Sequence, residues 1–501
     1  MPNFDPLHAS LECGAKAQHS KEALKSLCMR TSVTNLIDKW DELCRRYLPL
    51  ADEQSLWRYS RFPSTSDPEQ GWKLHLAATV LTATEVLERL GPFLRAKGIL
   101  FKAPRHLHEL SRLNSGLFYG YTQVGKTFTL YPPNDRECVS LAKELHQLTA
   151  GLPAPAVPFD ERYCSDSVVF YRYGSFKRRS IQNEDGTQTP AISDPSGNLI
   201  PDSRESVGPT WVTNPFPQND STTPAPGNPT VTNLRVIRAL TQRGKGGVYL
   251  TADFSGPSPR LCILKEGRKH GEVTFDGRDG YWRAKYEKRV LHALRRRGIA
   301  VPQIYSSFEL DSNYYLLTEH IEGKNLEELL KTRQRRLPIA RVLRLAFQVA
   351  RIVSILHSVG WVWRDCKPAN LILSESDTLR PVDFEGACRI GDRMPLNWGT
   401  EHFLPVDFNN EQYQSHPAID LYALGVVIYY LLTGRFPDKE NPLPVEKLRR
   451  RTPQSLRQIV SKLMSPTVNE RPSAQAVAQG LNEIILGNEV DFARQDRKAR
   501  I

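Results

Sequence analysis

The sequence predicts an α+β protein in which a mixed α/β domain is followed by a two-lobed domain. Between about residues 57 and 176, short runs typical of strands are interspersed with amphipathic helical patterns. Five prolines between residues 211 and 230 predict an extended linker. From residue 231, strand patterns come first and long helical patterns follow, which predicts one lobe rich in strands and one lobe of helices.

Composition and charge limit the class of protein. The chain has 501 residues, enough for two or three domains, and its 40% hydrophobic and 24% charged content is ordinary for a soluble protein. The net charge is +12, but the basic clusters are spread out and form no nucleic-acid-binding motif, so we expect no nucleic-acid partner. No apolar run of about 18 residues and no signal-peptide pattern occur, so we expect no membrane span and a cytoplasmic location. The eight cysteines are scattered without a CxxC pair, which indicates reduced thiols.

The first half contains the elements of the α/β domain. Leu36, Trp40, Leu43 and Tyr47 recur at helical spacing and predict one apolar helix face within an N-terminal extension. The next elements are predicted as strands over 71–80, 99–104, 126–133 and 167–176, and as helices over 83–98 and 136–151. A glycine stands at the end of each of these two helices, as is common at helix C-termini.

The second half begins with a strand, a turn and a strand over 234–254, followed by a strand over 260–267. A helix over 280–298, a strand over 314–323 and a long helix over 341–360 come next. Residues 419–434 are nearly all apolar, which predicts a helix buried on all sides in the second lobe. The segment 455–481 completes this helical lobe.

A stretch from residue 361 to 387 carries the clearest chemical pattern. Asp365, Lys367 and Asn370 form D-x-K-P-x-N, and Asp383 follows thirteen residues after Asn370. This ordered set is typical of phosphoryl transfer. We expect Asp365 to orient the attacking hydroxyl and Lys367 to steady the γ-phosphate, whereas Asn370 and Asp383 hold Mg²⁺. ATP and Mg²⁺ are therefore the expected cofactors.

Further residues are expected to bind ATP. Lys265 stands in a strand and Glu287 in the following helix, so the lysine would hold the α- and β-phosphates and the glutamate would hold the lysine. Thr318 and Glu319 come just before a hinge and would border the adenine pocket, and Asp420 is expected to brace the catalytic loop. A glycine turn would cradle phosphate with its backbone amides, and its residues are Gly246, Gly247 and Val248.

The stretch from 361 to 387 resembles the catalytic and metal-binding loops of protein kinases, with two departures. Trp363 stands where their His-Arg-Asp has histidine, and Glu385 stands where their Asp-Phe-Gly has glycine. Neither change removes a group that touches ATP, Mg²⁺ or the hydroxyl, so we expect an active enzyme. Trp-Arg-Asp together with Asp-Phe-Glu resembles the kinase domain of class III lanthipeptide synthetases.

The first half resembles the N-terminal region of the same synthetases. The matching segments are GWKLHLAAT, ILFKAP, GKTFTLYP and YRYGSF, which begin at residues 71, 99, 125 and 171. That region is itself similar to the phosphothreonine lyases of bacterial secreted effectors. We therefore expect five segments: an N-terminal extension (1–56), a lyase-like domain (57–210), a linker (211–230), a kinase-like domain (231–485) and a charged tail (486–501).

The resemblance implies two consecutive reactions on one peptide. The kinase would phosphorylate Ser or Thr, and the lyase would expel the phosphate by β-elimination to leave a dehydroamino acid. Lys102 would be the base, with its pKa lowered by burial or nearby cations, and His75 would protonate the leaving phosphate. Other side chains would hold the phosphate and polarise the neighbouring carbonyl, namely Lys126, Arg172 and Arg162 for the phosphate and Tyr131 for the carbonyl.

The synthetases also carry a C-terminal zinc-dependent cyclase, for which no ligand set follows the kinase segment here. The expected partners are therefore a peptide or protein substrate and a separate cyclase or other tailoring enzyme. Two alternatives stay open. One is a regulatory Ser/Thr kinase with an N-terminal peptide-binding domain, and the other is a non-catalytic pseudokinase scaffold.

Overall fold

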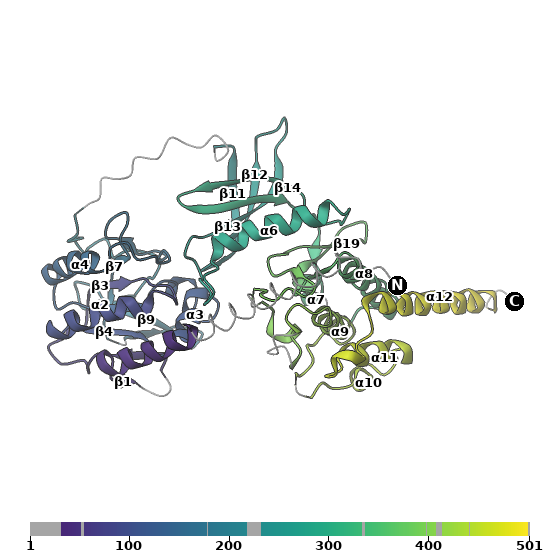
Figure 1. Cartoon of the computed structure of the whole chain (residues 1–501), viewed down its shortest axis with the longest axis horizontal. Coiled ribbons are helices and arrows are strands. Elements are labelled where there is room, and N and C mark those ends of the chain that lie inside the picture. Colours follow the sequence, from purple (N-terminus) through teal and green to yellow (C-terminus); the bar gives the residue numbers. More distant parts are fainter. Residues whose placement is uncertain are drawn as a thin grey trace, which may run out of the picture. The chain divides into compact units, whose positions relative to one another are not determined.

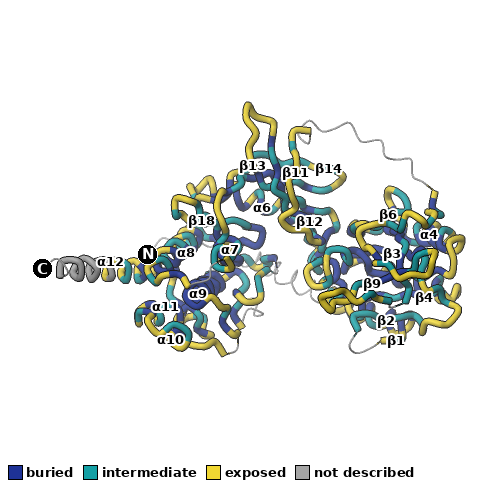
Figure 2. Tube along the Cα trace, turned by 180° about the vertical axis from the view of Figure 1, so that it is seen from behind, coloured by how far each residue is buried: buried dark blue, intermediate teal, exposed yellow. Residues whose placement is uncertain are grey.

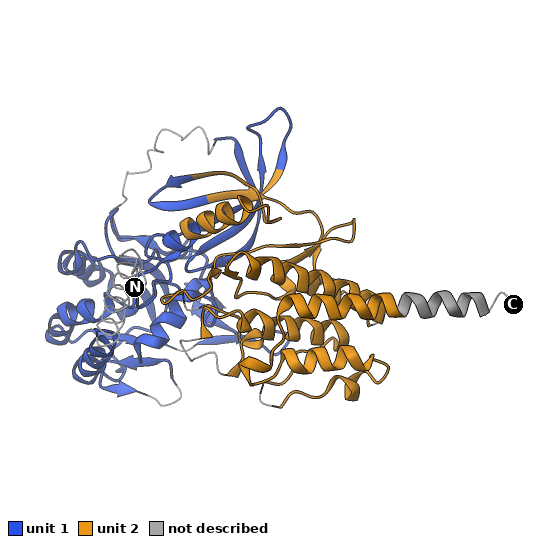
Figure 3. Ribbon diagram, turned by 45° about the vertical axis from the view of Figure 1, so that its right-hand side comes forward, with its two compact units in different colours: residues 1–260, 264–284, 308–315 blue, residues 261–263, 285–307, 316–501 orange. Residues whose placement is uncertain are grey.

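The computed structural model describes residues 32–51, 55–177, 179–217, 232–332, 336–396, 398–406, 413–439 and 441–498. They form an α+β protein, as predicted (Figure 1). Buried residues gather inside each part, and exposed residues follow the outer turns and strand edges (Figure 2). The chain divides into two compact units, one of residues 1–260, 264–284 and 308–315 and one of residues 261–263, 285–307 and 316–501 (Figure 3).

A seven-stranded sheet forms the centre of the N-terminal domain. Its strands lie in the order β1 (Leu50–Ala51), β2 (Trp57–Tyr59), β4 (Leu100–Pro104), β5 (Phe128–Tyr131), β3 (Gln70–Leu76), β7 (Val169–Ser175) and β6 (Glu161–Arg162). All neighbouring strands are antiparallel. Because side chains alternate along a strand, one face of β3 carries Trp72, Leu74 and Leu76, and the other face carries Lys73 and His75.

Helices cover the apolar face of this sheet. They are a helix over residues 32–47, α2 (Ala83–Ala96), α3 (Leu107–Ser115) and α4 (Asp135–Thr149), with a 3-10 turn η1 (Tyr121–Gln123) after α3. Figure 1 shows α2 and α4 beside β3 and β4. Trp72, Leu74 and Leu76 share one hydrophobic core with apolar residues of all four helices. The opposite face of the sheet, with its charged residues, is therefore left for chemistry.

The helix over 32–47 belongs to this core and is not a separate extension. Trp40 is fully buried, and Leu43 and Tyr47 are nearly so, which confirms the predicted apolar face. A Cβ on Gly91 of α2 would come within 2.5 Å of the Tyr47 ring, so the two helices pack closely at this glycine. The helix thus completes the domain that we expected to begin at residue 57; residues 1–31 of the expected extension lie outside the described residues.

A small three-stranded sheet follows, where the sequence predicted no strand. Its order is β10 (Leu199–Pro201), β9 (Gln188–Ser193) and β8 (Ser180–Gln182), joined by two tight hairpins. Gln70 of β3 anchors it, because its amide donates to the Ser193 carbonyl at 2.8 Å and accepts from the Ser193 amide at 2.6 Å. Most of the predicted linker, residues 218–231, lies outside the described residues.

A five-stranded sheet follows in the order β11 (Leu234–Arg243), β12 (Gly246–Asp253), β13 (Arg260–Gly267), β15 (Asn313–Glu319) and β14 (Ile304–Leu310). The helix α6 (Gly280–Arg295) joins β13 to β14. The predicted strand, turn and strand over 234–254 are present, and the turn consists of Gly244 and Lys245. The strand β14 was not predicted, and the division between the two units runs through this sheet.

The second unit is mainly helical. Its helices are α7 (Leu326–Lys331), α8 (Ile339–Ser358), α9 (Ala418–Thr433), α10 (Val445–Leu448), α11 (Gln454–Leu463) and α12 (Ala474–Lys498), with the turns η2 (Pro368–Asn370), η3 (Glu401–Phe403) and η6 (Val468–Glu470). Short strands hold its loops: β16 (Lys324–Asn325), β17 (Trp361–Val362), β18 (Leu371–Leu373), β19 (Leu379–Pro381) and β20 (Cys388–Arg389). Every residue of α9 is buried, as its apolar sequence predicted. The predicted tail differs, since α12 continues to Lys498.

Two sequence expectations concern the whole chain. In the part of the chain that the structure describes, no helix combines the length and apolarity that crossing a bilayer requires. The six cysteines in the described residues are all free thiols, and five of them are buried. The remaining two, Cys13 and Cys28, lie outside the described residues.

The core position of Trp40 yields the first prediction. Trp40→Ala should destabilise the N-terminal domain by about 3–5 kcal/mol, because it removes a fully buried indole and leaves a cavity. Native-state hydrogen exchange at the amides of β3 and α2 measures this loss. The exposed Asp38→Ala in the same helix is the control. Loss of protection confined to residues 32–47 would mean that this helix is an appendage.

Candidate functional site

The D-x-K-P-x-N loop forms a closed network around Asp365. The Asp365 carboxylate pairs with Lys367 at 2.9 Å and accepts a hydrogen bond from the Asn370 amide at 2.8 Å. Its other oxygen accepts from the Thr400 hydroxyl at 3.0 Å, and that hydroxyl also accepts from Lys367 at 2.9 Å. Burial raises the pKa of Asp365, Lys367 opposes this effect, and the nearby Asp383 adds to it. A carboxylate held in this way is suited to receive a proton from a hydroxyl.

Two short strands bring the predicted metal ligands together. The register of β18 with β19 pairs Leu371 with Pro381, and the Val382 amide donates to the Asn370 carbonyl at 2.9 Å. Val382 therefore faces Asn370, and Asp383 is the next residue along the chain. Its backbone is left-handed, with φ of 64°. The Asn370 and Asp383 side chains carry oxygen atoms of the kind that Mg²⁺ prefers, and their role as metal ligands stays a prediction.

Asp420 braces the catalytic loop, as expected. This fully buried carboxylate lies in the first turn of α9. It accepts the backbone amides of Trp363 at 2.7 Å and Arg364 at 2.6 Å, and it pairs with His357 of α8 at 2.9 Å. Arg364 has a left-handed φ of 67°, so the turn before Asp365 is strained and requires this support.

Trp363 replaces the histidine of other kinases and keeps a donor at its position. The indole Nε1 donates to the Asp383 carbonyl at 3.0 Å. The indole also stacks on Phe384, with ring centroids 5.5 Å apart and planes 20° apart. The Phe384 amide in turn donates to the Glu287 carboxylate at 3.0 Å. The catalytic loop, the metal-binding segment and α6 are thus joined through Trp363 and Phe384.

The residues predicted to bind ATP are divided between the two units. Lys265 of β13 and the glycine turn belong to the first unit, whereas Glu287, Thr318 and Glu319 belong to the second. Thr318 is buried and its hydroxyl donates to the Ile263 carbonyl at 3.3 Å, as suits the back of a pocket. The Glu319 side chain pairs with Arg380 at 2.5 Å, and its amide donates to the Gln303 carbonyl at 2.8 Å, so its place beside a base stays a prediction. The pairing of Lys265 with Glu287 stays a prediction.

The glycine turn requires its glycines. Gly246 has φ of 146°, and a Cβ there would come within 1.8 Å of the Glu266 carbonyl oxygen. A Cβ on Gly247 would come within 2.3 Å of the Tyr249 hydroxyl oxygen. The backbone therefore approaches β13 closely here, and the binding of phosphate by the amides of Gly246, Gly247 and Val248 stays a prediction.

Strand register places the predicted lyase residues on one face of the N-terminal sheet. Lys73 faces Arg172 across β3 and β7, and His75 faces Thr129 across β3 and β5. Thr129 in turn faces Lys102 of β4. Because paired residues of antiparallel strands project from the same face, these side chains share the face opposite the helices. Tyr131, two residues after Thr129, also lies on that face.

His75, Asp160 and Lys126 form a buried cluster on this face. The His75 Nδ1 atom lies 2.5 Å from one Asp160 oxygen, and the Lys126 amine lies 2.8 Å from the other. Burial lowers the pKa of His75 to about 3, although Asp160 acts against it. The pKa of Asp160 falls to about 2: burial raises it, but His75 and Lys126 outweigh burial. The cluster therefore holds a neutral imidazole beside an aspartate that also pairs with the Lys126 amine.

Lys73 is a second candidate base that the sequence did not single out. Burial lowers its pKa to about 7, and Arg172, Lys102 and Lys126 add to the effect, whereas Asp202 opposes it. Its amine donates to the Ser175 carbonyl at 3.0 Å. Arg172 is also buried and pairs with Asp202 at 2.7 Å. Lys73 is thus an amine that is partly neutral at physiological pH.

The other residues predicted for elimination, Lys102, Tyr131 and Arg162, make different contacts. The Lys102 amine lies over the Trp57 ring, 4.2 Å from its centroid. Tyr131 packs edge-on against Phe176, and burial raises its pKa. Arg162 donates to the carbonyls of Ser165 and Ser167 and covers the Phe170 ring at 4.7 Å. Its hydrogen bonds thus serve the neighbouring loop, and its phosphate contact stays a prediction.

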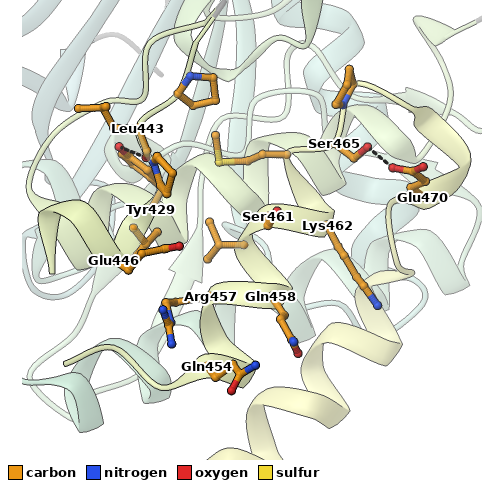
Figure 4. A pocket seen from close by; sticks show the side chains of 16 residues that line it. Tyr429, Leu443, Glu446, Gln454, Arg457, Gln458, Ser461, Lys462, Ser465 and Glu470 are labelled. Atoms are coloured by element: carbon orange, nitrogen blue, oxygen red, sulfur yellow. Dashed lines mark hydrogen bonds between the residues drawn. The ribbon is translucent and has the colours of Figure 1, made fainter. Parts of the chain in front are cut away.

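A separate cavity of about 680 Å³ lies in the second unit between α9, α10 and α11 (Figure 4). Tyr429, Leu443 and Arg457 line it, and Ser465 and Glu470 are hydrogen-bonded at its edge. No residue predicted for phosphoryl transfer or elimination lines this cavity. This cavity is therefore separate from the residues predicted for either reaction.

Three functional candidates were missed or underrated from the sequence. Thr400 bridges Asp365 and Lys367 from 35 residues away, and Asp160 joins His75 to Lys126 from 85 residues after the histidine. Neither has a local spacing signal. Lys73 lies two residues before His75 in the sequence, but its burial follows from β7 packing beside β3.

Comparisons with known families agree with the predicted pair of domains. Residues 50–226 match the family described as RamC, N-terminal domain, and residues 272–481 match the protein kinase domain. These matches confirm the predicted order of the two domains. The kinase match begins after β13, so it does not include the glycine turn or Lys265.

Similar proteins of known name fall into two groups. A probable SapB synthase of Streptomyces coelicolor is 32% identical over 398 residues, which is 74% of this chain and 41% of that protein. Serine/threonine-protein kinase F of Synechocystis is 29% identical over 273 residues, 49% of this chain and 54% of that kinase. Kinase D of the same organism is 27% identical over 271 residues, 50% of this chain and 52% of that kinase. The chain thus spans between 41% and 54% of the length of these relatives.

The Trp363 contact yields a prediction about phosphoryl transfer. Trp363→Phe should keep the stack on Phe384 but leave the Asp383 carbonyl without its indole donor. We expect the rate of phosphoryl transfer from ATP to fall by about tenfold to a hundredfold, measured with radiolabelled ATP. Trp363→His, which restores a ring N–H, should recover part of the rate.

Trp361→Phe is the matched control. Trp361 is also buried, but its indole nitrogen has no hydrogen-bond partner among the described residues. An equal loss of rate in both variants would assign the effect to packing and would contradict a role for the indole hydrogen bond.

Proposed function

Because the chain combines a RamC N-terminal domain with a protein kinase domain, we propose that it modifies Ser and Thr residues of a peptide in two steps. The kinase domain transfers the γ-phosphate of ATP to the hydroxyl, and the N-terminal domain eliminates that phosphate. The observation that carries the second step is the buried face that gathers Lys73, His75, Lys126 and Arg172. The resemblance to class III lanthipeptide synthetases supports a precursor peptide as the substrate.

The first step uses the Asp365 network. Asp365 accepts the proton of the Ser or Thr hydroxyl. The hydroxyl oxygen attacks the γ-phosphorus of ATP, and the bond between this phosphorus and ADP breaks. Lys367 and Thr400 fix the carboxylate, so it does not need to reorient. When bound, Mg²⁺ neutralises charge on the phosphates, and Asn370 and Asp383 would hold it. The names of the Synechocystis relatives support Ser and Thr as acceptors.

The second step is a β-elimination. A neutral amine removes the α-proton of the phosphorylated residue. The electron pair of the broken Cα–H bond forms the Cα–Cβ double bond, and the Cβ–O bond breaks to release phosphate. Burial and three neighbouring cations support Lys73 as the base, with Lys102 as the alternative from the sequence. Lys126 and Arg172 lie close enough to Lys73 to contribute to its electrostatic environment, which is consistent with a shared phosphate site.

His75 would protonate the departing phosphate, and its environment sets a condition on this role. Burial holds the pKa of His75 near 3, although the Asp160 carboxylate beside it acts in the opposite direction. A phosphate dianion beside the ring would favour the imidazolium strongly, because it adds two negative charges in a buried site. We therefore propose that His75 takes up its proton together with the phosphorylated substrate.

One observation favours a second candidate function. Lys126 and Arg172 are already paired with Asp160 and Asp202, so a phosphopeptide would have to compete with two carboxylates. Such a site could bind phosphopeptides without eliminating phosphate, in which case the protein is a regulatory Ser/Thr kinase with a binding domain. Release of inorganic phosphate from a synthetic phosphothreonine peptide without ATP separates the two functions.

The two-step proposal predicts a product mass. With ATP, Mg²⁺ and a pool of Ser- and Thr-containing peptides, the intact protein should yield peptides lighter by one water per modified residue, as mass spectrometry detects. Asp383→Asn should abolish both the phosphorylated and the dehydrated products, because it removes a charged metal ligand. Asp311→Asn is the matched control, since Asp311 also has a left-handed φ, 49°, but is exposed. Accumulation of phosphopeptide alone with the intact protein would rule out the lyase step.

The base assignment predicts a pH dependence of elimination. A lysine base acts when neutral, so with a pKa near 7 the rate of phosphate release from a phosphothreonine peptide should rise through about pH 7 and level off above it. Lys73→Met should lower this rate by about a hundredfold or more, the usual contribution of a general base.

Lys102→Met is the matched comparison, because it removes the other amine of the same sheet face. It should retain most of the rate and the rise near pH 7. The opposite pattern, in which Lys102→Met abolishes elimination and Lys73→Met retains the rise, would assign the base to Lys102.

A further inference from the structure

The hairpin turn that leads into Gly246, Gly247 and Val248, the residues predicted to bind ATP phosphate, is docked on the N-terminal domain. The Gly244 amide, at the tip of the hairpin between β11 and β12, donates to the Ser115 carbonyl at 3.0 Å. Ser115 is the last residue of α3, and both segments belong to the first compact unit. A Cβ on Gly244 would come within 1.7 Å of the Asn114 carbonyl oxygen, so the contact leaves no room for a side chain.

A second contact holds the same turn from the side of β13. The Arg268 guanidinium lies over the Tyr121 ring of η1 at 5.1 Å. The same arginine donates to the Arg243 carbonyl at 3.2 Å, and its amide donates to the Lys245 carbonyl at 2.8 Å. Arg268 therefore fixes both ends of the Gly244–Lys245 turn and connects them to the N-terminal domain.

The docked segment of the N-terminal domain leads directly to the cluster of His75, Asp160 and Lys126. The buried Asn114 side chain accepts from the Gly125 amide at 3.1 Å and donates to the Ala78 carbonyl at 2.9 Å. Lys126, the next residue after Gly125, pairs with Asp160, which also contacts His75. Asn114 thus touches the phosphate-binding turn of one site with its backbone and orients the loop of the other site with its side chain.

We propose that the N-terminal domain positions the phosphate-binding turn through this contact, and that nucleotide binding at the turn is thereby linked to the state of the Lys126–Asp160–His75 cluster. Linkage is reciprocal: if a nucleotide changes the affinity of the cluster for phosphopeptide, phosphopeptide changes the affinity for nucleotide by the same factor. The inference rests on the proposed function, because it assigns a phosphate ligand to each of the two sites.

Gly244→Ala tests the contact with little change to the turn itself. Gly244 does not have a left-handed φ, so alanine fits its backbone, and the clash arises from the Asn114 carbonyl. We expect the affinity for ADP with Mg²⁺, measured by titration calorimetry on the full chain, to fall by about fivefold or more. In the unchanged protein, ADP should slow hydrogen exchange over residues 107–127, and Gly244→Ala should remove this response.

Gly256→Ala is the matched control. Gly256 lies in the next hairpin, between β12 and β13, and its Cβ would meet nothing closer than the Ser258 carbonyl at 3.7 Å. This variant should bind ADP and show the exchange response as the unchanged protein does. Tyr121→Leu, which removes the ring under Arg268 and leaves the turn sequence intact, should act in the same direction as Gly244→Ala.

The outcomes separate this inference from the proposed function. If Gly244→Ala and Tyr121→Leu bind ADP as tightly as Gly256→Ala and keep the exchange response, the proposed linkage is wrong, whether or not phosphate is eliminated. If the response is lost in both variants while the unchanged protein releases no phosphate from a phosphothreonine peptide, the linkage holds and the lyase assignment fails.

Discussion

The need to pair buried carboxylates organises both candidate sites. An ionised carboxylate inside a protein is costly unless donors surround it, so its position fixes the groups that contact it. Asp420 does this for the kinase domain, where it gathers two consecutive backbone amides and His357. Asp160 does it for the N-terminal domain, where it holds His75 and Lys126. In each case the catalytic candidates owe their placement to a residue that need not touch the substrate.

The sequence could select the candidate residues for phosphoryl transfer because these residues are close along the chain. Asp365, Lys367 and Asn370 lie within six residues, so one loop positions all three. The burial of α9 also followed from its composition. Thr400 was missed because only the folding of the chain brings it to Asp365, which lies 35 residues earlier. Contacts between distant segments leave no local pattern, and Asp160 escaped for the same reason.

The sheet face proposed for elimination could be predicted in part. The family resemblance selected strands that prove to be neighbours, and the antiparallel register places most of the chosen residues on one face. The sequence could not rank Lys73 against Lys102, since the pKa of an amine depends on its burial and on surrounding charge. It also separated the helix over 32–47 from the domain, because a single amphipathic helix does not reveal which sheet its apolar face covers.

The indole at position 363 has one further consequence. A histidine at this place would exist in two neutral tautomers and one charged form, and its donor would depend on which form is present. Tryptophan has one donor and no ionisation near neutral pH. The bond from Trp363 to the Asp383 carbonyl is therefore made by the same atom in acidic and alkaline conditions. The connection between the catalytic loop and the metal-binding segment is in this respect independent of proton concentration.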